Sequence, residues 1–140
     1  MIEDLHFLLM RCFNYSNHAI VQRTATISLL PGQSKILECL LEHEGNSPKE
    51  IGAMCAIDKS TMTSLIGKME KQGLVLRKAH PDDKRSVTIW LTEKGRVKAN
   101  EAASLCSEVD SIAVKNLTDK QKKQLMEYLH TIIRNLEENS

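Results

Sequence analysis

The sequence lacks the features that mark several classes of protein. Its 140 residues include three prolines, and aromatic residues make up 4%, which disfavours a sandwich of many short strands. No apolar run approaches the ~18 residues of a membrane span, and acidic residues follow the first methionine where a secretory signal carries lysine or arginine. These absences predict a single-domain cytoplasmic protein that does not associate with membranes.

The sequence also lacks the usual signatures of catalysis and of metal binding. It contains no Gly-rich phosphate loop, no nucleophile elbow and no HExxH motif. The four cysteines (Cys12, Cys39, Cys55 and Cys106) form no CxxC pair, so reduced thiols are expected. Cys39 and His43 are spaced to chelate from one helix face, but two ligands do not make a zinc site. We therefore expect no enzymatic activity, no cofactor and no metal.

The charge is almost balanced overall but is unevenly distributed. The formal net charge is +1, which by itself argues against a polyanionic partner. Between residues 58 and 85, however, seven basic residues stand against four acidic ones, whereas the two ends of the chain are balanced. A local basic segment of this kind is the electrostatic signature of nucleic-acid binding, whatever the overall charge.

Helical periodicity covers both ends of the chain and much of its middle. Apolar residues recur at steps of three and four over residues 2–28 and again before Gly45, in a helix that we expect to begin at Pro31. Ser47-Pro48-Lys49-Glu50 predicts a capping box that starts a short helix ending near residue 56. Asp58 is expected to cap the next helix, and Gly73 to end it in a left-handed conformation.

The period then changes from 3.6 to 2, which indicates a β-hairpin over residues 74–91. Residues 74–79 and 86–91 are expected to be its strands, and the polar segment between them its exposed, basic tip. Helix resumes after Thr92 to about residue 115, and a second capping box at Thr118 starts the last helix. The order of four helices, a hairpin and two helices predicts a mainly α fold, a winged helix-turn-helix of the α+β class.

The helix after Asp58 has one apolar face and one polar face. Its outward residues are basic or carry a short hydroxyl, side chains that hydrogen-bond phosphates and base edges when such a helix enters the major groove. Basic residues at the hairpin tip are placed to reach the adjacent minor groove. The expected DNA-binding residues are Lys49, Lys59, Ser60, Thr61, Thr63, Ser64, Lys68, Arg77, Lys84 and Arg85. Taken one at a time, each is better explained as part of a solvated surface, and only the combination favours DNA.

Six motifs in register over residues 29–100 resemble the MarR family of bacterial transcription regulators. They are SPKEI at 47–51, IDKSTMT at 57–63, MEKQGLV at 69–75, Arg77, PDDKR at 81–85 and LTEKG at 91–95. The resemblance implies a homodimeric regulator, most often a repressor, that binds a pseudo-palindromic operator with half-sites about one helical turn (~10 bp) apart and is released by a small organic ligand. Residues 1–30 and 96–140 would form the dimerisation helices, and residues 31–95 the DNA-binding lobe.

The resemblance also implies roles for residues of the wing. Arg85 would insert into the minor groove, Asp83 would support the wing by pairing with Lys68, and Arg77 would hold the wing base or a phosphate. The sequence departs from the family where Leu30 replaces a capping threonine and Gly52 a usual alanine. The apolar stripes of the first and last helices agree with dimerisation, because so small a chain cannot cover both.

The signal to which the protein responds is less evident. The organic-peroxide branch of the family carries a reactive cysteine early in the first helix, where this sequence has His6. Cys12 lies later on the same helix and is the one candidate for a redox sensor, although its position on the apolar face favours a small core residue. A cysteine-based redox regulator therefore remains an alternative, as does a winged-helix module that binds another protein. No residue can be assigned to a ligand pocket.

Overall fold

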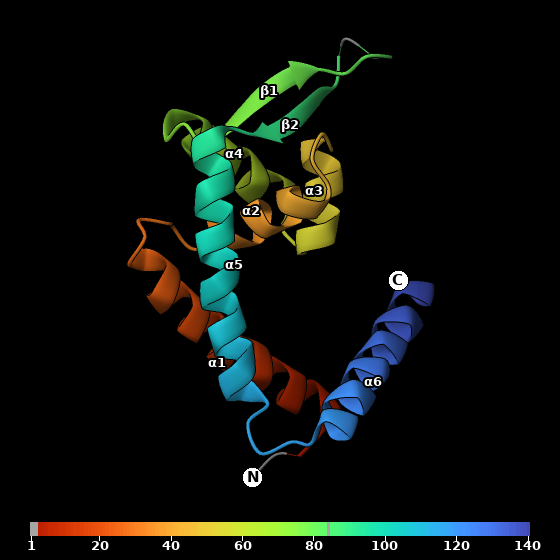
Figure 1. Ribbon diagram of the computed structural model, residues 1–140. Helices are drawn as coiled ribbons and strands as arrows, with labels where there is room; N and C mark the ends of the chain where they lie inside the picture. The colour runs from red at the N-terminus through yellow and green to blue at the C-terminus, as the bar shows by residue number, and fades with distance from the viewer. Residues whose placement is uncertain (1–2, 84) are drawn as a thin grey trace. The chain divides into compact units, whose positions relative to one another are not determined.

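The computed structural model describes residues 3–83 and 85–140, so Lys84 lies outside the described residues. The elements follow in the order α1 (Leu5–Ala25), α2 (Gln33–Glu42), α3 (Pro48–Cys55), α4 (Lys59–Lys71), β1 (Val75–Ala79), β2 (Val87–Leu91), α5 (Glu93–Ala113) and α6 (Asp119–Glu138) (Figure 1). The chain divides into two compact units, one ending at Val109 and one running from Asp110 to Ser140. The predicted element order is confirmed.

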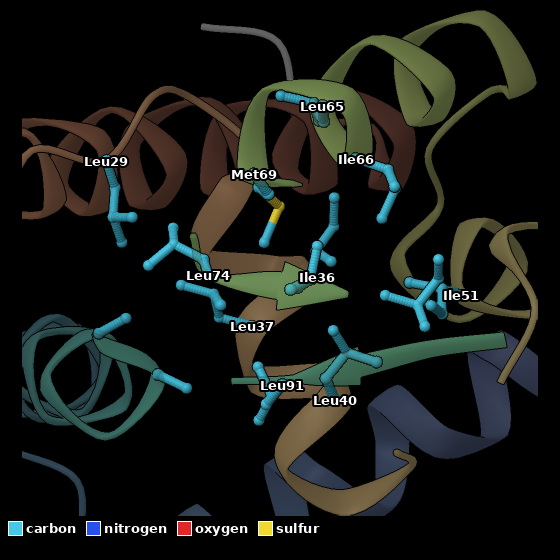
Figure 2. Close-up of a cluster of buried hydrophobic side chains, with 14 of the residues drawn as sticks. Leu29, Ile36, Leu37, Leu40, Ile51, Leu65, Ile66, Met69, Leu74 and Leu91 are labelled. Carbon is cyan, nitrogen blue, oxygen red and sulfur yellow. The ribbon is translucent and has the colours of Figure 1, made fainter. Parts of the chain in front are cut away.

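The core of the first unit lies where α2, α3 and α4 pack together beneath the hairpin (Figure 2). Ile36, Leu37 and Leu40 of α2 are completely buried, because their spacing puts them on one helix face. Ile66 of α4 and Ile51 of α3 pack into the same cluster. This core holds α3 and α4 in the helix-turn-helix arrangement and leaves the opposite face of α4 exposed.

The caps that define α3 and α4 form as the sequence predicts. The Ser47 hydroxyl accepts the Glu50 N–H at 3.2 Å, and the Glu50 carboxylate accepts the Ser47 N–H at 3.1 Å. These bonds lower the pKa of Glu50. The Asp58 carboxylate accepts the Thr61 N–H at 2.9 Å at the start of α4, and Gly73 ends that helix with a φ of +73°. Local sequence therefore fixes both ends of α4.

The start of α2 differs from the expected one. Pro31 and Gly32 form a turn, and α2 begins at Gln33. The buried Gln33 side chain accepts the Leu30 N–H at 2.9 Å and donates to the Gln72 side chain at 2.8 Å. Pro31 as the first helical residue is therefore wrong, because the positive φ of Gly32 (+89°) interrupts the helix at this point.

The strands of the hairpin pair in an antiparallel register with Arg77 opposite Ile89. The loop between α2 and α3 pairs with β2 through two backbone hydrogen bonds. Gly45 N–H donates to the Ile89 carbonyl, and Ile89 N–H donates to the Asn46 carbonyl, both at 2.9 Å. Trp90 lies over Gly45, where an added Cβ would stand 2.7 Å from the indole ring. The base of the wing is thus attached to the helical core, and its tip extends beyond it (Figure 1).

Helix α5 begins at the base of the wing, where its first turn lies directly against Leu74. The Thr92 hydroxyl accepts the Gly95 N–H at 2.9 Å and donates to the Gly73 carbonyl at 2.6 Å. Further along, Lys98 Nζ donates to the Ile27 carbonyl at 2.9 Å, which connects α5 to the end of α1. Because α5 contacts both the base of the hairpin and the turn that follows α1, it joins the hairpin to the N-terminal part of the chain.

The second unit consists of the end of α5 and α6. Thr118 and Gln121 form the predicted capping box at the start of α6. No residue of α6 is buried, although the helix carries a regular apolar stripe. Within the described residues, no helix is long and apolar enough to cross a membrane.

Candidate nucleic-acid interface

One exposed surface of α4 carries most of the predicted DNA-binding side chains. Its apolar face, which includes Met62, Leu65 and Ile66, is buried in the core, so the opposite face must point outward. The exposed residues are Lys59, Ser60, Thr61, Thr63, Ser64 and Lys68, and Lys49 of α3 is also exposed. The structure therefore presents these residues to solvent, as a helix that enters the major groove requires.

Three hydroxyl groups on this surface, those of Ser60, Thr61 and Thr63, are engaged at the start of the helix. Ser60 and Thr61 donate their hydroxyl protons to the Asp58 carboxylate at 2.8 and 2.9 Å, and Thr63 donates to the Lys59 carbonyl at 3.0 Å. The bonds from Thr61 and Ser60 lower the pKa of Asp58, so the cap stays ionised. Because a carboxylate already occupies this helix end, phosphate contacts are expected from side chains rather than from the helix dipole.

Helices α3 and α4 approach each other closely at Gly52. A Cβ at this position would lie 3.0 Å from the Ile57 carbonyl and 3.1 Å from Met62 Cγ. Gly52, which stands where the family usually has alanine, therefore has a packing reason. Beside this contact, the two helices enclose a hollow of about 700 Å³ that Lys49 and Lys59 help to line.

Asp83 organises the described part of the wing tip. Its carboxylate accepts the Arg85 N–H at 3.0 Å and the Ser86 hydroxyl at 3.2 Å, in a local turn that presents Arg85 to solvent. No ion pair joins Asp83 to Lys68 among the described residues. The expected pairing with Lys68 is therefore wrong in this structure, since Asp83 supports the wing through its own turn.

Arg77 connects the first wing strand to α4. Its Nε lies 2.6 Å from Glu70 Oε1, and both side chains are partly exposed. An arginine whose Nε–H is used in this way supports the wing base, which is one of the two roles expected for it. The pair thus adds a contact between α4 and β1, at residues seven positions apart.

The cysteines occupy different surroundings. Cys106 is buried, whereas Cys12 is exposed on α1, so the interpretation of Cys12 as a core residue is wrong for the single chain. Burial raises the pKa of the Cys39 thiol, and it raises the pKa of Cys55 to about 12. Both thiols are therefore protonated at neutral pH, a state that reacts slowly with oxidants.

Several residues that shape this interface escaped prediction from the sequence. Glu70 holds Arg77, and the Gln33 side chain connects the start of α2 to Gln72 at the end of α4. Glu44 accepts the Leu91 N–H at 2.9 Å and contacts Arg96 at 2.8 Å, which attaches the wing to α5. Gln33 and Glu44 have partners that are distant in sequence, so no local pattern predicts these contacts. Glu70 and Arg77 are only seven residues apart, but they belong to different elements.

These features define a winged helix-turn-helix protein whose exposed helix and wing carry basic side chains. Comparison with known proteins agrees. Residues 29–87 match the model of the MarR family. The organic hydroperoxide resistance transcriptional regulator of Bacillus subtilis is 32% identical over 72% of this chain and 67% of its own length. The HTH-type transcriptional repressor YetL of the same organism is 27% identical over 86% of this chain and 73% of its own length.

The fold also matches solved structures. A protein from Listeria monocytogenes, crystallised in complex with 26mer DNA, aligns with a TM-score of 0.92 at 20% identity, over 99% of this chain and 92% of that one. The chain belongs to the MarR family of transcriptional regulators. Both Bacillus relatives are named as transcription regulators, as the motifs of this sequence predict.

Proposed function

We propose that this regulator is a homodimeric repressor that acts in the cytoplasm. It binds a pseudo-palindromic DNA operator through α4 and the wing and is released by a small organic ligand. The observation that carries the proposal is that Lys59 and Lys68 on α4 and Arg85 at the wing tip are all exposed. The related Listeria protein bound to DNA and the repressor among the relatives support the same function.

The apolar surfaces of the terminal helices support a dimer. Large apolar side chains are exposed on α1 and on α6, among them Leu5, Leu8, Phe13, Met126, Ile133 and Leu136. Apolar surface of this extent is unfavourable in water and is commonly covered by a symmetric partner. We therefore assign residues 1–30 and 96–140 to dimerisation and residues 31–95 to DNA binding, with the two α4 helices of the dimer placed in successive major grooves.

The hollow between α3 and α4 supports release by an organic acid. Its volume of about 700 Å³ is within the usual range for small-molecule sites. Ala53, Ile57 and Met62 give it an apolar lining, and Lys49 and Lys59 add positive charge. An aromatic carboxylate in this hollow would compete with DNA for the same two lysines, so its affinity would differ between free and DNA-bound protein, as an inducer requires.

The test is a titration of the purified, reduced protein with the DNA upstream of its own gene. Trp90 is a convenient fluorescent reporter, because Lys78 Nζ lies 4.4 Å from its ring and both belong to the wing. We expect salt-sensitive binding of a complex that contains two chains, reversed by an aromatic acid such as benzoate. Absence of binding at low salt would contradict the proposal and favour a module that binds another protein.

The same titration after treatment with an organic peroxide tests the redox alternative. One relative is named for organic hydroperoxide resistance, and Cys12 is exposed on α1. If the protein is regulated by an organic acid, peroxide leaves its DNA affinity unchanged. Release by peroxide that Cys12→Ser abolishes would make Cys12 the sensor instead.

Lys59→Ala is expected to weaken DNA binding evenly across sequences. If Lys59 neutralises one phosphate, the slope of log K against log salt falls by about 1, because one fewer counterion is released. The measurement is the affinity over a range of salt concentrations, with Lys123→Ala, an exposed lysine of α6, as the matched control. An unchanged slope for Lys59→Ala would show that this lysine does not contact the DNA backbone.

A further inference from the structure

Three sulfur atoms gather on the surface between α2 and α3, away from the exposed face of α4. Cys39 Sγ lies 3.9 Å from Met54 Sδ, and the Cys55 thiol, which donates to the Lys35 carbonyl at 3.5 Å, interacts electrostatically with Cys39. All three residues line one surface hollow of about 580 Å³. The cluster thus joins one residue of α2 to two adjacent residues at the end of α3.

The separation of the Cys39 and Met54 sulfur atoms matches that expected for two ligands of one small, soft cation. Metal–sulfur bonds of about 2.3 Å place the ligands of a trigonal site about 4.0 Å apart, close to the Cys39–Met54 separation of 3.9 Å. Thiolate and thioether ligands together select Cu(I), whereas zinc is held by thiolate, imidazole or carboxylate. The described residues contain no group of three or more His, Cys, Asp or Glu side chains that would hold a metal, so the thioether is an essential ligand here.

We propose that Cys39, Met54 and Cys55 form a binding site for a soft monovalent metal ion, Cu(I), which ties α2 to α3. Binding replaces the two thiol protons with bonds to the metal and leaves the thioether neutral. One Cu⁺ enters and two protons leave, so the site changes from neutral to a net charge of −1 without oxidation or reduction. Glu38 and Glu42 line the same hollow and favour the approach of a cation, whereas Lys35, which also lines it, opposes that approach. His43 lines the hollow as well.

The protonation state of the thiols makes the proposal testable by pH. Burial raises the pKa of Cys39, and it raises the pKa of Cys55 to about 12, so both protons are present at neutral pH in the free protein. Metal binding must release them. The Cu(I) affinity is therefore expected to rise with pH across the neutral range, by up to about 100-fold per pH unit when both protons leave.

The experiment uses the reduced full-length protein without DNA under anaerobic conditions. Cu(I) is supplied in competition with a chromogenic Cu(I) chelator whose affinity is constant over the pH range. We expect one Cu(I) per chain. Cys39→Ser and Cys55→Ser should each lower the affinity by more than the roughly 100-fold that the loss of an outer-shell partner costs.

Met54→Leu distinguishes a Cu(I) site from a dithiol that binds any thiophilic metal. Met54 is 47% exposed, so the variant is expected to fold, and it should lose Cu(I) affinity without a change in Zn(II) affinity. Cys12→Ser and Met126→Leu, which remove exposed sulfurs elsewhere, are the matched controls and should leave Cu(I) binding unchanged.

Two results would overturn the assignment. One is Cu(I) binding that the substitutions at Cys39 and Cys55 do not affect, and the other is a Met54→Leu variant with unchanged Cu(I) affinity. Because the readout is metal binding in the absence of DNA, failure here leaves the proposed DNA-binding function untouched, and failure of DNA binding leaves the metal site intact.

Discussion

Gly95→Ala is expected to destabilise the protein by about 3 kcal/mol, the upper end of the usual cost of forcing an extra methyl group into a packed site. A Cβ at Gly95 would stand 1.9 Å from the Leu74 carbonyl oxygen and 2.8 Å from its carbon. These are backbone atoms, so no side chain can rotate away. The gain of about 1 kcal/mol in helix propensity from replacing glycine by alanine is too small to offset the clash. Urea unfolding monitored by circular dichroism measures the difference.

Gly67→Ala is the matched control for this prediction. Gly67 lies within α4, and no atom stands within 4 Å of a Cβ built there. The same change in propensity applies without a clash, so the variant should be more stable than the parent by about 0.5–1 kcal/mol. If both glycine variants changed stability in the same direction, the close approach at Gly95 would not be the cause.

Arg85→Ala is expected to weaken operator binding by about 10- to 100-fold, roughly 1–3 kcal/mol. Arg85 is exposed at the wing tip, and Asp83 accepts its backbone N–H, so the backbone is held while the guanidinium remains available to DNA. A guanidinium in a narrow minor groove favours A·T-rich flanks. The variant should therefore also lose preference for such flanks, which competition between operators with A·T and G·C flanks measures.

Two further variants distinguish the effect of the position of Arg85 on DNA affinity from the effect of its charge. Arg11→Ala removes the same charge from the exposed surface of α1 and should change the affinity little. Arg85→Lys retains the charge but loses the planar fork, so it should bind more weakly than the parent and more tightly than Arg85→Ala. Equal losses in Arg11→Ala and Arg85→Ala would show that only overall charge matters.

The fold could be predicted from the sequence because its helix ends are defined by local signals. The capping residues Ser47, Asp58 and Thr118 all form the predicted bonds, since a cap involves residues only three positions apart. The hairpin followed from its period of two, with boundaries displaced by one residue at the start of each strand. The outward face of α4 followed from the spacing of its buried residues.

The rest could not be predicted because it depends on contacts between residues distant in sequence. The bond between Gln33 and Gln72 and the approach of Gly95 to Leu74 have no local signature. The interpretation of Pro31 failed because a proline that fits a first helical turn also fits a β-turn, and the following glycine decided between them. The proposed dimer and the proposed effector each involve a second molecule, so a single chain cannot test them.

The carboxylate of Asp58 at the start of α4 has a thermodynamic consequence. Since Asp58 and the hydroxyls of Ser60 and Thr61 satisfy one another, the first turn of this helix is complete before DNA arrives. Association then requires little ordering of the backbone, so the entropy lost on binding arises mainly from long side chains such as Lys59 and Lys68. Because this helix is already formed, substitutions of its exposed side chains can change the preferred DNA sequence with little effect on folding.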